Sequence, residues 1–273
     1  MVAFVFSGGA SHSAVQVGML RALAEAGIEP DALYGTSAGA INAAVISRLP
    51  PTERLEALIA AWRTFIKRPP LPRSLRRSAM TVIGRRAALS DPWPLRTQLF
   101  ETFGDARIED SAIPLFITAT NLLSGHERLF DSGNLIETLM ASCAVPGLFP
   151  PVEIDGTPFV DGLLYGAPAR AAVEAEHDTL YLLLTNSVLP ADQVPTSWWG
   201  IARRAATMIM WNQLLAPAQG DAGTGATIRI VPAPISLSKV GRWDFKHTEA
   251  LLAESYEVAS RWLAKSADEE LVP

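Results

Sequence analysis

Cysteine and histidine are scarce in this sequence, with one cysteine and four histidines among 273 residues. The single thiol, Cys143, cannot form an intramolecular disulfide, and no cluster of Cys and His has the spacing of metal ligands. We therefore expect no structural disulfide, no metal and no cofactor.

Positive charge and long apolar runs are also lacking. Acidic residues outnumber lysine and arginine by 28 to 23, and the net charge of −5 favours no nucleic-acid partner. No apolar run approaches the roughly 20 residues that a membrane-spanning helix needs. VAFVF follows the first methionine without the basic region of a signal peptide. We expect a soluble, cytoplasmic protein.

The apolar content, 49% of 273 residues, is enough for the core of one large domain spanning 1–273. Hydrophobic periodicity predicts strands at 2–6, 32–36, 114–120, 179–185 and 227–231. It predicts helices at 15–26, 38–47, 52–67, and near 133–143, 168–176, 197–215 and 245–264. This alternation indicates an α/β fold, with a mainly parallel central sheet covered by helices on both faces.

Two segments are candidates for contact with a membrane surface. Prolines and arginines in 68–92 predict a mobile basic excursion or lid, whose residues 73–86 could meet anionic headgroups or form a solvated loop. The segment 197–215 combines tryptophans and methionines with two arginines, which suits either an interfacial helix or an ordinary core helix. We expect these segments to allow peripheral membrane contact.

A candidate nucleophile lies between the second predicted strand and the helix that follows it. Gly35-Thr36-Ser37-Ala38-Gly39 matches G-x-S-x-G, in which a sharp turn exposes the serine hydroxyl and the two flanking glycines avoid collision with neighbouring backbone. The amides at the start of that helix would favour developing negative charge. The alternative is a tight turn in which Ser37 only caps the helix.

A serine nucleophile needs a base, and the sequence offers two solutions. In the order of an α/β-hydrolase, Ser37 would be followed by Asp161 or Asp178 and then by His247, although WDFKHTEALL places His247 in a solvated first helical turn. Alternatively Asp161, at the end of a predicted hairpin that turns at Asp155-Gly156, reaches a cleft as a carboxylate base. An Asx turn or a helix cap is the structural alternative for Asp161.

Three blocks together resemble the patatin-like phospholipase family over residues 1 to about 185. They are Ser7-Gly8-Gly9, the motif from Gly35 to Gly39, and Asp161-Gly162 preceded by ASCAVPGLFPP. Residues 190–273 match the family only weakly and are expected to be helical. The resemblance implies a three-layer α/β/α fold, lipid ester substrates, and a dyad of Ser37 as nucleophile with Asp161 as base. It also implies an oxyanion hole made by the amides of Gly8, Gly9 and Ala10.

The first loop departs from the family pattern, which reads roughly GGG-A-R-G. Here Ala10, Ser11, His12 and Ser13 follow the two glycines. A positive φ at Ala10 or Ser13 would cost on the order of 1 kcal/mol. Protonated His12 would replace the missing basic residue, or His12 is a surface residue at a helix start.

These observations leave three classes of function. The first is a serine acyl hydrolase that cleaves lipid esters through an acyl-enzyme on Ser37, as a patatin-like dyad or as an esterase that uses His247. The second is a non-catalytic lipid- or acyl-binding protein with an altered oxyanion loop. A dinucleotide-binding domain is disfavoured, because SGGASHS lacks the G-x-G-x-x-G pattern.

Overall fold

The computed structural model describes residues 1–70, 88, 90–162, 171–173, 175, 177–185, 196–197, 201, 205, 208 and 226–269. The basic segment 73–86, most of the expected lid at 68–92 and almost all of 197–215 lie outside these residues. No helix in the described ranges combines the length and apolarity that crossing a membrane requires.

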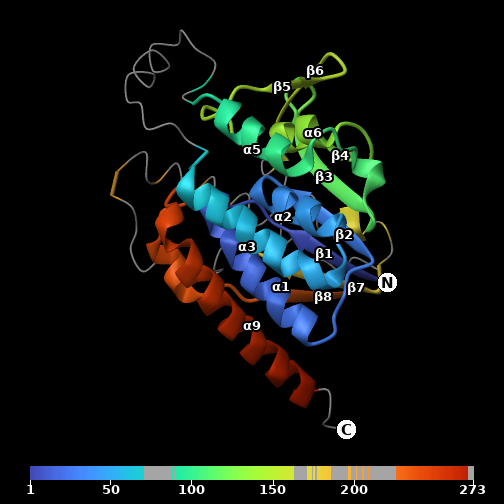
Figure 1. Cartoon of the computed structure of the whole chain (residues 1–273), viewed down its shortest axis with the longest axis vertical. Helices are drawn as coiled ribbons and strands as arrows, with labels where there is room; N and C mark the ends of the chain where they lie inside the picture. The colour runs from blue at the N-terminus through green and yellow to red at the C-terminus, as the bar shows by residue number, and fades with distance from the viewer. Residues whose placement is uncertain are drawn as a thin grey trace.

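The described residues contain one eight-stranded sheet (Figure 1). Its strands are β1 (Val2–Phe6), β2 (Ala32–Thr36), β3 (Leu115–Asn121), β4 (Glu127–Phe130), β5 (Val152–Ile154), β6 (Thr157–Asp161), β7 (Thr179–Leu183) and β8 (Thr227–Val231). The order is β5-β6-β3-β2-β1-β7-β8, with β4 also paired to β3. The strands β3, β2, β1, β7 and β8 are parallel to one another. The strands β4, β5 and β6 are joined to the sheet by antiparallel pairs.

The helices are α1 (Val15–Glu25), α2 (Ala38–Ser47), α3 (Pro51–Lys67), α5 (Trp93–Phe103), α6 (Leu135–Ser142) and α9 (Thr248–Glu269). Short 3₁₀ helices are η1 (Ala10–Ala14), η2 (Ile108–Asp110), η4 (Ile235–Lys239) and η5 (Phe245–His247). The expected strand–turn–helix units are confirmed. The last helix begins at Thr248, because η5 occupies the residues before it, and β4 and α5 were not expected.

Side chains alternate between the two faces of the sheet, as the period of a strand requires. In β1, Phe4 and Phe6 join a large core with α1, α2, α3, α5, α6 and α9, while Ala3 and Val5 join a smaller core. Helical residues 171–173 cover the second face. The sheet is therefore flanked by helices. Figure 1 shows α9 lying along α1, on the face that carries the larger core.

The two edges of β3 explain how distant segments meet. Residues 117–120 of β3 pair with β4, whereas 115–118 pair with β2 and 119–121 pair with β6. Because β4 occupies one edge over this stretch, β2 and β6 must follow one another along the other edge. Since β2 runs parallel and β6 antiparallel to β3, their carboxyl ends meet head to head.

Candidate active site

Ser37 lies in a strained turn between β2 and α2. Its φ of 54° and ψ of −131° are rare for a residue with a side chain, and such strain is characteristic of functional turns. Ser37 occupies the N-cap position of α2, but its side chain makes no capping hydrogen bond. The alternative that Ser37 merely caps the helix is therefore wrong, and its hydroxyl is not engaged in holding the helix end.

The turn is held by a second serine from another element. Ser142, at the end of α6, accepts a hydrogen bond from the Ser37 amide at 2.8 Å and donates one to the Thr118 carbonyl at 2.7 Å. Ser142 is fully buried. Its hydroxyl thus connects the turn at Ser37 to β3, and buried bonds of this kind are costly to lose.

The motif glycines allow close backbone contacts around Ser37. A Cβ on Gly35 would lie 2.5 Å from the Ala40 Cα, and one on Gly39 would lie 2.5 Å from the Ser7 carbonyl oxygen. Neither position can carry a side chain without moving backbone. The start of α2 therefore packs directly on the end of β1, which brings the loop after Ser7 beside Ser37.

Asp161 lies at the carboxyl end of β6, where the sequence predicted it. It pairs with Ala119 of β3, and Thr36, the residue before Ser37, pairs with the adjacent Thr118. A Cβ on Gly162 would lie 2.5 Å from the Thr118 carbonyl oxygen, so this position also requires glycine. Asp161 is buried, with 2% of its surface exposed. The two predicted catalytic residues thus lie at strand ends that adjoin along one edge of β3.

Cys143 links these two residues electrostatically. Its thiol lies beside the Ser37 side chain, with which it shares a pocket, and in the field of Asp161. Burial raises the pKa of the Cys143 thiol well above its ordinary range, and the Asp161 charge raises it further. The side chain is therefore a neutral thiol at physiological pH, beside Ser37.

The loop after β1 is anchored by buried side chains. Gln16 donates hydrogen bonds to the Ser7 and Leu183 carbonyls at 2.8 and 2.9 Å, and Thr185 donates to the Gly8 carbonyl at 2.6 Å. Asn42 of α2 donates to Gln16 at 2.8 Å. This network fixes the loop against both the sheet and helix α2.

Three consecutive amides of this loop are available as donors. Within the described part of the chain, the backbone N–H groups of Gly8, Gly9 and Ala10 donate no hydrogen bond. Ala10 has a φ of 52°, so the third position of the glycine block does adopt the left-handed conformation, at a cost on the order of 1 kcal/mol. Ala10 borders the same pocket as Ser37. The geometry can accommodate an oxyanion.

His12 does not lie where the sequence suggested. It is 6% exposed, so the surface interpretation is wrong, and its Nε2 donates to the Val240 carbonyl at 2.8 Å. Burial lowers the pKa of His12, and Arg242 lowers it further. A neutral imidazole at physiological pH gives no support to a role as cation in the oxyanion loop.

The residues of the alternative triad are not assembled. Asp178 precedes β7, at the amino ends of the parallel strands and away from Ser37, and its carboxylate contacts the amino group of Met1. The side chain of His247 is 57% exposed and lies 3.6 Å from Asp244. Among the residues that the structure describes, no group of three or more metal-ligating side chains occurs.

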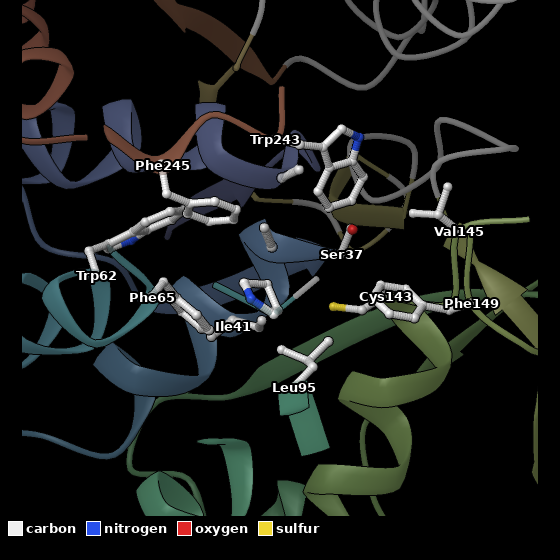
Figure 2. Close-up of a pocket in the computed structure, with 13 residues that line it drawn as sticks. Ser37, Ile41, Trp62, Phe65, Leu95, Cys143, Val145, Phe149, Trp243 and Phe245 are labelled. Carbon is white, nitrogen blue, oxygen red and sulfur yellow. The ribbon is translucent and has the colours of Figure 1, made fainter. Parts of the chain in front are cut away.

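A largely apolar pocket, termed the apolar pocket below, opens at Ser37 (Figure 2). It is lined by Ala10, Ser37, Ala38, Ile41, Trp62, Phe65, Pro70, Leu95, Cys143, Val145, Phe149, Trp243 and Phe245. Figure 2 shows Trp62, Phe65 and Phe245 grouped on one side of Ser37, Val145 and Phe149 on the other, and Cys143 between the two groups. The pocket is chemically suited to a hydrocarbon chain.

Sequence reasoning missed Ser142 and the aromatic wall of the apolar pocket. Ser142 lies in the ASCAVPG stretch, but its role is evident only from the hydrogen bond that it accepts from the Ser37 amide. Trp62 and Phe65 follow the buried face of an amphipathic helix, which fits any core position. Phe245 comes from η5, far along the chain, and no local signal marks it as part of this site.

Comparison with known proteins gives one family. The family model described as patatin-like phospholipase matches residues 4–173. Proteins named lysophospholipase from Aspergillus terreus and Pyricularia oryzae are 30% and 28% identical over 161 residues. Those residues are 59% of this chain and 10% of each relative, so the match spans about a tenth of the relatives' length.

Solved structures give more distant likenesses. VipD from Legionella pneumophila matches 92% of this chain and 66% of its own, at a TM-score of 0.42 and 11% identity. The type III effector ExoU matches 96% of this chain and 53% of its own, at a TM-score of 0.38 and 16% identity. At these TM-scores the likeness supports no conclusion about this chain.

Proposed function

Since this chain belongs to the patatin-like phospholipase family, we propose that it is a serine acyl hydrolase that cleaves carboxylic ester bonds of lipids. Ser37 is the nucleophile and Asp161 the base. The observation that carries the proposal is the junction on β3, where the strands before Ser37 and ending at Asp161 meet beside an apolar pocket.

The first half-reaction forms an acyl-enzyme. As the Ser37 hydroxyl attacks the ester carbonyl, its proton passes to the Asp161 carboxylate and the carbonyl oxygen becomes an oxyanion. The amides of Gly8, Gly9 and Ala10 donate to that oxyanion. Asp161 then protonates the departing alcohol oxygen, and the carbonyl reforms as an ester on Ser37.

Water completes the reaction. Asp161 takes a proton from a water molecule that attacks the acyl-Ser37 carbonyl, and the same amides hold the second oxyanion. Collapse breaks the bond to Ser37 Oγ, which regains its proton from Asp161, and releases the fatty acid. No histidine takes part, which agrees with the exposure of His247 and its contact with Asp244.

The substrate class follows from the pocket and the relatives. Apart from the Ser37 hydroxyl and the Cys143 thiol, the residues that line the pocket present apolar side chains, including Phe65 and Leu95. Burial of a hydrocarbon chain there contributes roughly 0.8 kcal/mol per methylene. Because the relatives are named lysophospholipases, we propose that monoacyl phospholipids are among the substrates.

Hydrolysis assays with a medium-chain p-nitrophenyl ester and a monoacyl phospholipid test this function. We expect Ser37→Ala and Asp161→Asn each to lower kcat by about 10³-fold or more, because each removes one member of the acyl-transfer pair. His247→Ala serves as the matched control and should retain wild-type kcat. Activity that survives in Ser37→Ala, or that disappears in His247→Ala, would overturn the assignment.

A further inference from the structure

Ser11 and His12, in the loop after β1, form hydrogen bonds to residues 240–242, which precede the C-terminal helix α9. The Ser11 amide and hydroxyl donate to the Arg242 carbonyl at 2.9 and 2.8 Å, and the hydroxyl also lies 3.3 Å from the Gly241 carbonyl. His12 Nε2 donates to the Val240 carbonyl at 2.8 Å. Ser11 is fully buried and His12 nearly so, which shields these bonds from water.

The held segment, residues 240–245, also forms part of the apolar pocket. Trp243 and Phe245 line the pocket that contains Ser37. Phe245 is buried, with ring centroids 6.4 Å from both Trp62 and Phe65, whereas Trp243 is 42% exposed. Figure 2 shows the Trp243 ring beside Ser37. The 240–245 segment therefore joins the oxyanion loop at one end to the pocket wall at the other.

On the loop side, the same residues are tied to the oxyanion donors. The His12 amide donates to the Gly9 carbonyl at 3.1 Å, which closes a turn that contains the Ala10 amide and directly follows the amides of Gly8 and Gly9. Gly9 is pressed against Thr185, since a Cβ there would lie 2.6 Å from the Thr185 Cβ. The direction of the amides thus depends on how η1 is held.

We propose that Ser11 and His12 are positioning residues that keep the oxyanion amides in register with the 240–245 wall of the apolar pocket. The inference rests on the proposed function. An acyl chain that reaches Trp243 and Phe245 then contacts the segment that orients the amides. The hydrogen bonds from Ser11 and His12 to residues 240 and 242 are termed the clasp below. Catalytic rate therefore depends on acyl-chain length through the clasp, because a displacement of the oxyanion amides by about 1 Å can cost 10²-fold in rate.

The neutral state of His12 fits this role. Burial keeps the imidazole uncharged, and a carbonyl can only accept, so Nε2 carries the proton. Glutamine can present an amide N–H at a similar distance from its backbone, whereas leucine has comparable bulk and no donor. Substitution by these two residues separates the hydrogen bond from packing.

The test compares kcat and KM of the full chain on p-nitrophenyl acetate and p-nitrophenyl laurate. We expect Ser11→Ala and His12→Leu to lower kcat on laurate about tenfold or more, with a smaller loss on acetate. His12→Gln should recover most of the loss. Ser47→Ala is the matched control, since Ser47 is a buried serine at the other end of α2 whose hydroxyl donates to the Ala44 carbonyl.

A second arm measures coupling to the pocket wall. Trp243→Ala and His12→Leu should be non-additive on laurate, because both disturb one connected unit. Trp93→Ala, at an exposed tryptophan on α5 outside the apolar pocket, should combine additively with His12→Leu. If His12→Leu fails to fold, the same cycle with Ser11→Ala provides the test.

The outcomes separate this inference from the proposed function. Folded Ser11→Ala and His12→Leu proteins with wild-type kcat on both esters would show that the clasp is only structural. If His12→Gln were as impaired as His12→Leu, packing and not the hydrogen bond to Val240 would account for the loss, and the positioning role of His12 would be overturned. Wild-type protein that forms no fluorophosphonate adduct on Ser37 would instead overturn the proposed function before any variant is compared.

Discussion

Ser37 and Asp161 stand at the carboxyl ends of two strands that meet along one edge of β3, beside Thr118 and Ala119. One strand runs parallel and the other antiparallel to β3, so a single edge brings together residues more than a hundred positions apart. The arrangement gives the candidate site a rigid base, because Asp161 is itself paired with Ala119 and Ser37 directly follows the paired residue Thr36.

Ser142 should be important for both activity and stability, although we assign it no part in the chemical steps. Ser142→Ala leaves the Ser37 amide buried without its acceptor, so we expect a loss of about 1–3 kcal/mol in the free energy of unfolding. We also expect kcat to fall, because the strained turn loses its anchor. Urea denaturation and ester hydrolysis measure the two effects, and Ser47→Ala should lower stability while leaving kcat unchanged. Equal kcat in both variants would contradict this role.

Gly39 should tolerate substitution far less well than a glycine in open space. In Gly39→Ala the new Cβ would lie 2.5 Å from the Ser7 carbonyl oxygen, and relief of that contact costs about 3 kcal/mol and moves the oxyanion loop. Gly104→Ala is the control, because Gly104 has a φ of 57° but no atom near a Cβ, which predicts only about 1–2 kcal/mol. Thermal unfolding of both proteins provides the comparison, and a Gly39→Ala protein as stable as Gly104→Ala would show that the close contact is absent.

Stability should fall as pH drops below about 6.5, the ordinary pKa of histidine. Burial lowers the pKa of His12 in the folded chain, so the unfolded chain takes up a proton at a pH where the folded chain does not. Protonation therefore favours unfolding from about pH 6.5 down to the folded pKa. His177, whose pKa is also lowered by burial, acts in the same direction.

Urea unfolding at pH 7.5 and pH 5 measures this effect, and His12→Gln isolates the part due to His12. We expect the variant to lose less stability than wild type between the two pH values, with His177 unchanged in both. An identical loss in the two proteins would show that His12 takes up its proton equally in both states.

Cys143 should be almost inert toward thiol reagents in the folded protein. Its side chain is buried and its pKa is raised, so thiolate, the reactive form, is scarce. Since it is the single cysteine, a colorimetric disulfide reagent at pH 8 reports this thiol alone. We expect slow reaction in the native state and rapid, complete reaction in urea. A native rate equal to the denatured rate would contradict the burial of Cys143 beside Ser37.

The sequence predicted the local structure of the candidate site better than its surroundings. The strand Ala32–Thr36 and the helix after Ser37 follow from periodicity, and Asp155-Gly156 forms the expected turn with φ values of 51° and 72°. The pairing of β2 and β6 on one edge of β3 did not follow, since register between distant strands leaves no local pattern.

His12 illustrates the limit most clearly. A polar residue at a helix start is usually exposed, yet His12 is covered because its partner, the Val240 carbonyl, lies 228 positions away. The strand β4 and the helix α5 were likewise not evident, because β4 is short and half exposed and α5 has two aromatic residues, Trp93 and Phe100, facing solvent. Tertiary contacts determine such positions more strongly than local sequence does.

The most direct measurement of the central claim is covalent labelling with an alkyl fluorophosphonate, read by intact mass and peptide mapping. Wild-type protein should gain one adduct on Ser37, and folded Asp161→Asn should gain it at least about a hundredfold more slowly, because its nucleophile lacks a base. A folded wild-type protein with no adduct on Ser37, or Asp161→Asn labelled at the wild-type rate, would contradict the Ser37–Asp161 pair.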